Sequence, residues 1–108
     1  MKKNLRIKEG ERKMNNNYYI VRGRDSGVFF GKIKERTGQE ITMTEVRNIW
    51  YWDGAATMLQ LASEGTKKPD NCKFTMTINE IVLLDAIEII PCTDSAVKSI
   101  KEVSEWKR

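Results

Sequence analysis

Histidine is absent from this 108-residue sequence, and the absence bears first on catalysis. The imidazole is the side chain whose ordinary pKa lies closest to neutrality, so it is the usual general base of enzymes. A serine or cysteine nucleophile in this chain would need a lysine or a carboxylate instead. Asp85 and Glu88 are close in sequence, but a separation of three in a strand directs them to opposite faces. We therefore expect that the protein is not an enzyme.

Cysteine and proline occur only twice each, and long apolar runs do not occur. Cys72 and Cys92 have no neighbouring cysteine or histidine, so we expect small buried side chains and neither a metal nor a cofactor. No run reaches the roughly 18 apolar residues of a membrane span, and the first residues lack the apolar segment of a secretory signal. These absences predict a soluble, cytosolic protein that has no membrane partner.

The basic residues are unevenly distributed along the chain. The net charge of +4 resides in residues 1–13, because the remaining basic and acidic residues cancel. Capture of a phosphate polymer needs a continuous basic face, so this balance disfavours nucleic acid as a partner. The length suits one core without a deep internal cavity, which places any ligand in a surface cleft or between subunits. We predict a polar basic tail over residues 1–16 and a single ligand-binding α+β domain over residues 17–108.

The first half of that domain has the pattern of hairpins followed by a helix. Alternation of apolar and polar residues predicts strands over residues 18–22, 27–34 and 39–47, with a hairpin turn at Thr37-Gly38 and a bend near Thr44. A helix is then predicted with Asp53 as its cap and Gly65 just past its end. Its apolar positions recur at helical spacing: Ala55, Met58, Leu59 and Ala62.

The second half returns to strand-like alternation. Residues 72–77 predict a strand, followed by a turn near Asn79-Glu80 and an apolar strand over residues 81–90. Strict alternation would bury Asp85 in that last strand, so we expect a bulge, a bend or a partner for its carboxylate.

A final helix is expected after Pro91, capped by Thr93 or Asp94, and Trp106 is expected to anchor the chain behind it. Hairpins predominate over β-α-β alternation in this order of elements. We therefore predict an α+β fold, with a mainly antiparallel β-sheet and two packed α-helices.

The segment Arg22-Gly23-Arg24-Asp25-Ser26-Gly27 combines accessible backbone N–H groups at its glycines with arginine and serine donors. This combination suits a phosphate or pyrophosphate. The candidate contacts are Arg22, Arg24, Ser26 and Gly27. The alternative interpretation is a plain hairpin turn, because the segment is not a glycine loop between a strand and a helix.

Aromatic residues supply the other half of a nucleotide site, since a purine stacks on a flat ring. The candidates are Phe29, Trp50 and Phe74, and Arg47 lies just upstream of Trp50, where it could neutralise a phosphate. The alternative for each ring is packing in the core, which a domain of this size needs.

Five segments of the sequence, residues 18–22, 26–31, 49–56, 69–74 and 87–93, resemble a family of small phage proteins, the Thoeris anti-defence sponges. The most specific stretch runs from Trp50 to Ala56 and contains Trp50-Tyr51-Trp52-Asp53-Gly54. The resemblance implies a viral protein in the cytoplasm of an infected bacterial host. Its ligand would be an immune signal, above all a cyclic ADP-ribose isomer, which it would sequester without cleaving. Cyclic oligonucleotides of related defence systems such as CBASS are further ligands implied by the family.

The resemblance also implies a β-rich fold with two helices and a homo-oligomer, a dimer or higher, with ligand held where subunits meet. In such a site the arginine and loop donors would meet the phosphates, and an aromatic ring would stack on the adenine. Two other classes stay open on the residues alone. One is a nucleic-acid-binding module that uses the basic tail, and the other is a protein-interaction module that hides the tryptophans in an interface.

Overall fold

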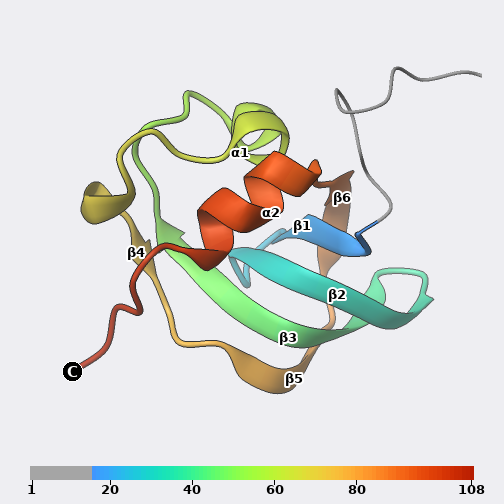
Figure 1. The fold of residues 1–108 in the computed structure, drawn as a ribbon. Coiled ribbons are helices and arrows are strands. Elements are labelled where there is room, and N and C mark those ends of the chain that lie inside the picture. The colour runs from blue at the N-terminus through green and yellow to red at the C-terminus, as the bar shows by residue number, and fades with distance from the viewer. Residues whose placement is uncertain (1–15) are drawn as a thin grey trace, which may run out of the picture.

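The computed structural model of this chain describes residues 16–108, which form one curled sheet with two α-helices on one side (Figure 1). The predicted α+β fold with a mainly antiparallel sheet is confirmed, because every paired strand among these residues runs antiparallel to its neighbour. The elements are, in chain order, β1 (Tyr18–Gly23), β2 (Val28–Thr37), β3 (Glu40–Tyr51), α1 (Met58–Glu64), the short 3-10 helix η1 (Pro69–Asn71), β4 (Lys73–Phe74), β5 (Ile78–Leu83), β6 (Ala86–Pro91) and α2 (Asp94–Lys101).

The sheet has the strand order β4-β3-β2-β1-β6, and β5 pairs with the first half of β3. Consecutive hairpins build β1, β2 and β3, whereas β6 returns from the end of the chain to pair with β1. The backbone N–H of Ala86, where β6 begins, donates to the carbonyl of Gln39 at the tip of the β2–β3 hairpin (3.0 Å). The sheet is therefore curled so that the start of β6 lies next to the turn that precedes β3.

Two apolar cores lie on opposite faces of this sheet. The helix-side core packs the helices onto the strands, and the strand-side core fills the concave face of the curl. Neighbouring residues alternate between them, since Ile20 and Phe30 belong to the first core, and Val21 and Phe29 to the second. This is the period of two that a pleated strand imposes. Both faces of β1 and of the first half of β2 are buried or half-buried as a result.

A bend in β3 is confirmed close to the predicted position. The pairing of β2 with β3 changes register between Phe30 and Lys32, and Glu45 has a left-handed backbone conformation with φ of 48°. Gly31 lies opposite this bend, where a Cβ atom would come within 2.9 Å of the Thr44 carbonyl oxygen and the Val46 Cα. The sheet can bend here because residue 31 has no side chain.

The first helix differs from its prediction at the start. Thr57 is the cap, since its Oγ1 accepts from the Gln60 N–H (3.1 Å), whereas Asp53 lies four residues earlier, where its Oδ1 accepts from the next N–H along the chain. The later start turns the buried face to Leu61 and Ala62 and leaves Leu59 61% exposed. The predicted end at Gly65 is correct.

The second half also departs from the prediction in two places. Asn79 and Glu80 lie inside β5, so the turn expected there is wrong, and the chain turns instead at Leu84-Asp85. The strand predicted over residues 72–77 is reduced to β4, because Thr75 bonds to Asn48 rather than continuing the ladder. Thr93 caps α2 as predicted, its side chain accepting from the Ala96 N–H.

Most of the predicted basic tail, residues 1–15, lies outside the described residues. Asn16, the last residue assigned to it, is attached to the domain: its Nδ2 donates to the Cys92 carbonyl (3.0 Å), and its Oδ1 accepts from the Tyr18 N–H (2.8 Å). Within residues 16–108, neither helix has the length and apolar character needed to cross a membrane.

Candidate ligand-binding site

A surface hollow of about 230 Å³ lies where the β1–β2 loop meets the end of β3. It brings together three of the residues predicted to bind ligand, namely Ser26 and Gly27 from the loop and Trp50 from the strand. The rest of its lining is Val28, Asn48, Ile49 and Trp52. Residues some 25 positions apart in sequence therefore form one concave surface, which we call the tryptophan hollow.

The β1–β2 loop owes its shape to a carboxylate from another part of the chain. Asp85 accepts three hydrogen bonds from the loop: the Asp25 N–H (2.7 Å), the Ser26 N–H (3.1 Å) and the Ser26 hydroxyl (2.7 Å). These bonds, the Ser26 hydroxyl first, lower the pKa of Asp85. The partner expected for Asp85 is thus found. The loop presents its donors to an anion, as the sequence suggested, but this anion is the chain's own carboxylate.

Gly27 makes the return from the loop into β2 possible. Its φ of 109° lies in the region that favours glycine, and its carbonyl accepts from the Gly23 N–H (2.8 Å), which closes the turn. Because the backbone has no side chain at this point, the wall of the tryptophan hollow beside Asn48 stays open: a Cβ here would lie 3.4 Å from the Asn48 Nδ2.

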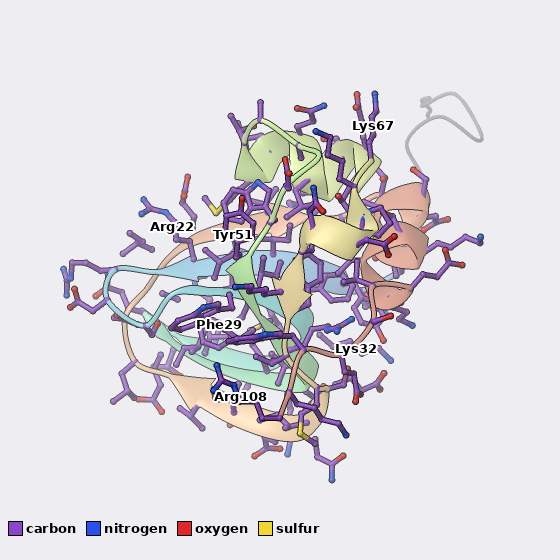
Figure 2. The ribbon with its side chains drawn as sticks, turned by 90° about the vertical axis from the view of Figure 1, so that its left-hand side faces the viewer. Arg22, Phe29, Lys32, Tyr51, Lys67 and Arg108 are labelled. Atoms are coloured by element: carbon purple, nitrogen blue, oxygen red, sulfur yellow. The ribbon has the colours of Figure 1, made fainter. Side chains whose placement is uncertain are left out.

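The two candidate arginines flank the loop and are accessible to a ligand. Arg22, at the edge of the fold in Figure 2, pairs through its Nε with the Glu88 carboxylate (2.7 Å), and its side chain is 42% exposed. Arg24 lies 3.9 Å from Asp25 and is more exposed still. Within residues 16–108, neither arginine engages its two terminal nitrogens in a hydrogen bond or ion pair. These nitrogens are the donors that suit a phosphate.

Trp50 is the aromatic candidate that remains available for stacking. Its side chain is 66% exposed, and it stacks on Trp106 with ring centroids 6.0 Å apart and planes 19° apart. Trp106 is held in turn by its backbone N–H, which donates to the Phe74 carbonyl (2.8 Å). Trp52 is half-buried, and its indole N–H donates to the Ala55 carbonyl (3.1 Å). The ring of Trp50 is therefore supported by the ring of Trp106, and Trp52 is held by its hydrogen bond to Ala55.

Three of the predicted site residues lie inside the fold instead. Phe29 and Phe74 are core residues, 7% and 0% exposed, and Figure 2 shows Phe29 against the sheet. Arg47 is 4% exposed, and its guanidinium donates to the carbonyls of Phe74, Thr75, Ile100 and Val103 at 2.8 to 3.2 Å. Phe74 is fully buried, whereas Phe29 and Arg47 contribute to the wall of a separate pocket of about 190 Å³. The Arg47 charge ties β3 to β4 and to the end of α2.

Asn48 is a residue of the hollow that the sequence pattern did not indicate. Its Nδ2 donates to the Val28 carbonyl (3.2 Å), and its backbone N–H donates to the Thr75 hydroxyl (2.8 Å). The available signal was an amide two residues before Trp50, but the direction of its side chain depends on the bend in β3. Among the described residues, no three histidine, cysteine or acidic side chains cluster as a metal site.

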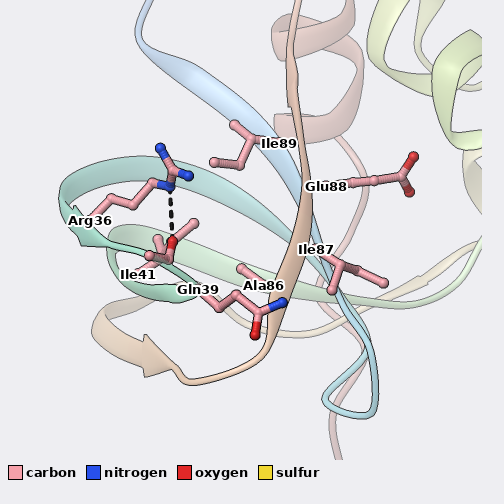
Figure 3. A pocket seen from close by; sticks show the side chains of 8 residues that line it. Arg36, Gln39, Ile41, Ala86, Ile87, Glu88 and Ile89 are labelled. Atoms are coloured by element: carbon pink, nitrogen blue, oxygen red, sulfur yellow. Dashed lines mark hydrogen bonds between the residues drawn. The ribbon is translucent and has the colours of Figure 1, made fainter.

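A larger hollow, of about 490 Å³, lies at the seam between the β2–β3 hairpin and β6 (Figure 3). Arg36 and Glu88 line it with opposite charges, and the Arg36 Nε donates to the Gly38 carbonyl (3.0 Å). None of the predicted site residues lines it.

A family model described as a domain of unknown function (DUF6948) matches residues 16–100. No curated protein matches the chain. No solved structure matches it either.

Proposed function

We propose that this chain, which belongs to the DUF6948 domain family, binds and sequesters a cyclic nucleotide immune signal without cleaving it. A cyclic ADP-ribose isomer is the first ligand to test, and cyclic oligonucleotides are the second. The setting that goes with this activity is the cytoplasm of a phage-infected bacterium. The observation that carries the proposal is the tryptophan hollow, which sets an exposed indole beside a loop flanked by two accessible arginines.

The chemistry of such a ligand divides between the two sides of the hollow. An adenine stacks on Trp50, whose ring is already supported by Trp106. The pyrophosphate meets the terminal nitrogens of Arg22 and Arg24, since a guanidinium binds a phosphate through two parallel N–H groups. Binding of this kind needs no bond to be broken.

The groups lining the hollow favour holding a ligand over cleaving it. The one hydroxyl among them, that of Ser26, donates to Asp85. The pKa of Asp85 is lowered by the loop, so its carboxylate is a weak base and activates that hydroxyl poorly. Sequestration then depends on affinity and on a protein concentration above that of the signal.

The size of the hollow supports the homo-oligomer that forms part of this proposal. Pockets that enclose small-molecule ligands usually have volumes of about 300–1,000 Å³, and the hollow has about 230 Å³ and is open. Trp50 and its neighbour Tyr51 are 66% and 51% exposed. A second copy that covers these rings would complete the enclosure and bury both of them.

The test is calorimetric titration of the purified protein with a panel of cyclic ADP-ribose isomers and cyclic oligonucleotides, followed by recovery of the ligand after heat denaturation. We expect tight binding of at least one compound and its release unaltered. Trp50→Ala should weaken this binding by about 5- to 150-fold, the range for losing one stacked base. Leu59→Ala, equally exposed on α1 but outside the hollow, is the matched control.

Three outcomes would overturn the proposal. Absence of binding across the panel would favour the protein-interaction alternative, for which the exposed Trp50 and Tyr51 are the supporting observation. Chemically altered ligand would mean that the chain is an enzyme. Equal affinity of Trp50→Ala and the unmodified protein would place the ligand elsewhere.

A further inference from the structure

Another pocket, of about 280 Å³, lies between the sheet and the end of α2. It shares no residue with the tryptophan hollow or with the hollow at the β2–β3 hairpin. It is lined by Tyr18, Phe30, Glu45, Arg47, Thr77 and Lys101. We call it the Tyr18 pocket. Tyr18 and Phe30 stack with ring centroids 5.0 Å apart, so one wall of the pocket is flat and aromatic.

Positive charges gather at this pocket from three elements. The Lys101 ammonium on α2 lies 4.4 Å from the centre of the Tyr18 ring, and the Lys32 ammonium on β2 lies 5.5 Å from it. Lys32 is 3.2 Å from the Glu45 carboxylate, to which the Tyr18 hydroxyl also donates (2.8 Å). Among residues 16–108, Lys101 has no carboxylate within ion-pair distance.

Arg47 adds a third positive charge from the floor of the pocket. All four hydrogen bonds of its buried guanidinium go to backbone carbonyl oxygens, and no ion pair within the described residues includes it. Carbonyl dipoles satisfy its N–H groups, but they carry no net negative charge. The charge of Glu105 also acts on Arg47, where it partly opposes the lowering of the Arg47 pKa by burial. Three cationic groups, Arg47, Lys32 and Lys101, therefore face two carboxylates, Glu45 and Glu105.

That carboxylate is held in place by an unusual backbone conformation. Glu45 has φ of 48°, which is uncommon for a residue with a side chain. Such positions concentrate at ligand sites, because the surrounding structure must hold them there. Here the bend directs the carboxylate to Tyr18 and Lys32, and Lys101 stays without a carboxylate at ion-pair distance within residues 16–108.

We infer that the Tyr18 pocket is a binding site for a phosphate group, with Lys101 as its charged contact and the Thr77 hydroxyl as a donor. The negative charge of a phosphate group offsets the surplus of positive charge, to which Lys32 contributes from beside Glu45, and the stacked rings of Tyr18 and Phe30 form a wall of the pocket. This site is independent of the tryptophan hollow. The inference about the Tyr18 pocket therefore stands even if no cyclic nucleotide binds in the tryptophan hollow.

Pyrophosphate is the probe, and the readout is the midpoint of thermal unfolding, since a ligand that binds only the folded state raises it. Sodium chloride at matched ionic strength is the reference, and inorganic phosphate and AMP distinguish free phosphate from a phosphate carried on a nucleoside. We expect the midpoint of thermal unfolding to rise with pyrophosphate concentration, above its value in sodium chloride. The backbone amide of Thr77 should shift in NMR spectra over the same concentrations.

Variants locate the effect. Lys101→Ala should weaken the apparent affinity for pyrophosphate about tenfold or more, as expected for loss of a charged hydrogen bond, and Thr77→Val should weaken it without removing a charge. Lys98→Ala, one turn earlier on α2 and paired with Glu102, should leave the affinity unchanged. Trp50→Ala should also leave it unchanged, so that failure of this site and failure of the tryptophan hollow give different results.

Two results would overturn the inference. An equal midpoint in chloride and pyrophosphate would mean that the surplus charge attracts no specific anion. An affinity that falls with Arg24→Ala or Trp50→Ala but not with Lys101→Ala would assign the phosphate to the tryptophan hollow.

Discussion

Replacing Arg47 by methionine should destabilise the fold strongly. The guanidinium donates four hydrogen bonds to backbone carbonyls, and the side chain is only 4% exposed. A methionine fills much of the same volume but donates nothing. The Thr75 and Val103 carbonyls then lose the Arg47 donor, whereas the Phe74 and Ile100 carbonyls still accept from the Trp106 and Val103 N–H groups. A buried acceptor left without a donor costs about 1–3 kcal/mol. The carbonyls cannot be replaced by apolar groups, so the repacking that can compensate for a lost buried ion pair is not open here.

The losses do not add in full, because the bonds share one group, two of the carbonyls keep a backbone donor and water can reach the less buried Thr75. We expect the free energy of unfolding to fall by about 3–5 kcal/mol, a large part of the roughly 5–15 kcal/mol of a typical domain. Equilibrium unfolding in urea, followed by tryptophan fluorescence, measures it. For an m-value of about 2 kcal/mol/M the midpoint should drop by about 2 M.

Arg36→Met is the matched control for this substitution. Arg36 is exposed and donates one hydrogen bond, to the Gly38 carbonyl, so its loss should change the free energy of unfolding by no more than about 0.5 kcal/mol. The reasoning fails if Arg47→Met loses less than about 1 kcal/mol. It also fails if Arg47→Lys restores full stability, because a lysine carries the charge but cannot reach four carbonyls at once.

Two further predictions concern titration and thiol reactivity. Since the pKa of Asp85 is lowered in the fold, its bonds to the β1–β2 loop contribute fully above its unfolded pKa of about 3.9 and are lost as the pH falls through the lower folded value. NMR signals of the loop amides should therefore move as the pH falls below about 4, and the movement should be smaller in Asp85→Asn. A thiol-specific reagent at pH 8 should modify the half-buried Cys72 in the native protein and Cys92 only after unfolding. The reason is that burial raises the pKa of Cys92 to about 12. If both thiols react at the same rate in native buffer, the prediction is wrong.

Much of the fold could be predicted because local sequence patterns determine it. Alternation and turn residues identified the β1–β2–β3 hairpins, and the bend near Thr44 followed from a change of phase within the third strand. The errors occurred where distant residues decide the outcome. Asp53 is a good cap by type, but it accepts from Asn71 across the structure, and Thr57 caps α1 instead. The turn expected at Asn79-Glu80 is absent because β3 is long enough to pair with β5 on both sides of Asn79, through Glu80 and Ile78.

The candidate site was predictable in its parts but not in its assembly. The loop donors and Trp50 were recognised by chemical type, and the structure places Ser26, Gly27 and Trp50 around one hollow. Which aromatic rings stay exposed depends on strand register, and register assigns Phe29 and Phe74 to the two cores. A three-dimensional structure was also needed to find that Asp85 already occupies the loop's donors, because it comes from the opposite half of the chain.

The pairing of β1 with β6 determines when the chain can finish folding during synthesis. Tyr19 pairs with Pro91, about 70 residues later, and α2 follows β6. At a synthesis rate of about 5–20 residues per second, β1 waits about 4–14 s for its second neighbour. In that interval the β1–β2–β3 hairpins can form, but the apolar side chains that later pack under α2 stay exposed to solvent. Such non-local contacts slow folding, so this nascent intermediate is the species on which a chaperone would act and from which aggregation would start.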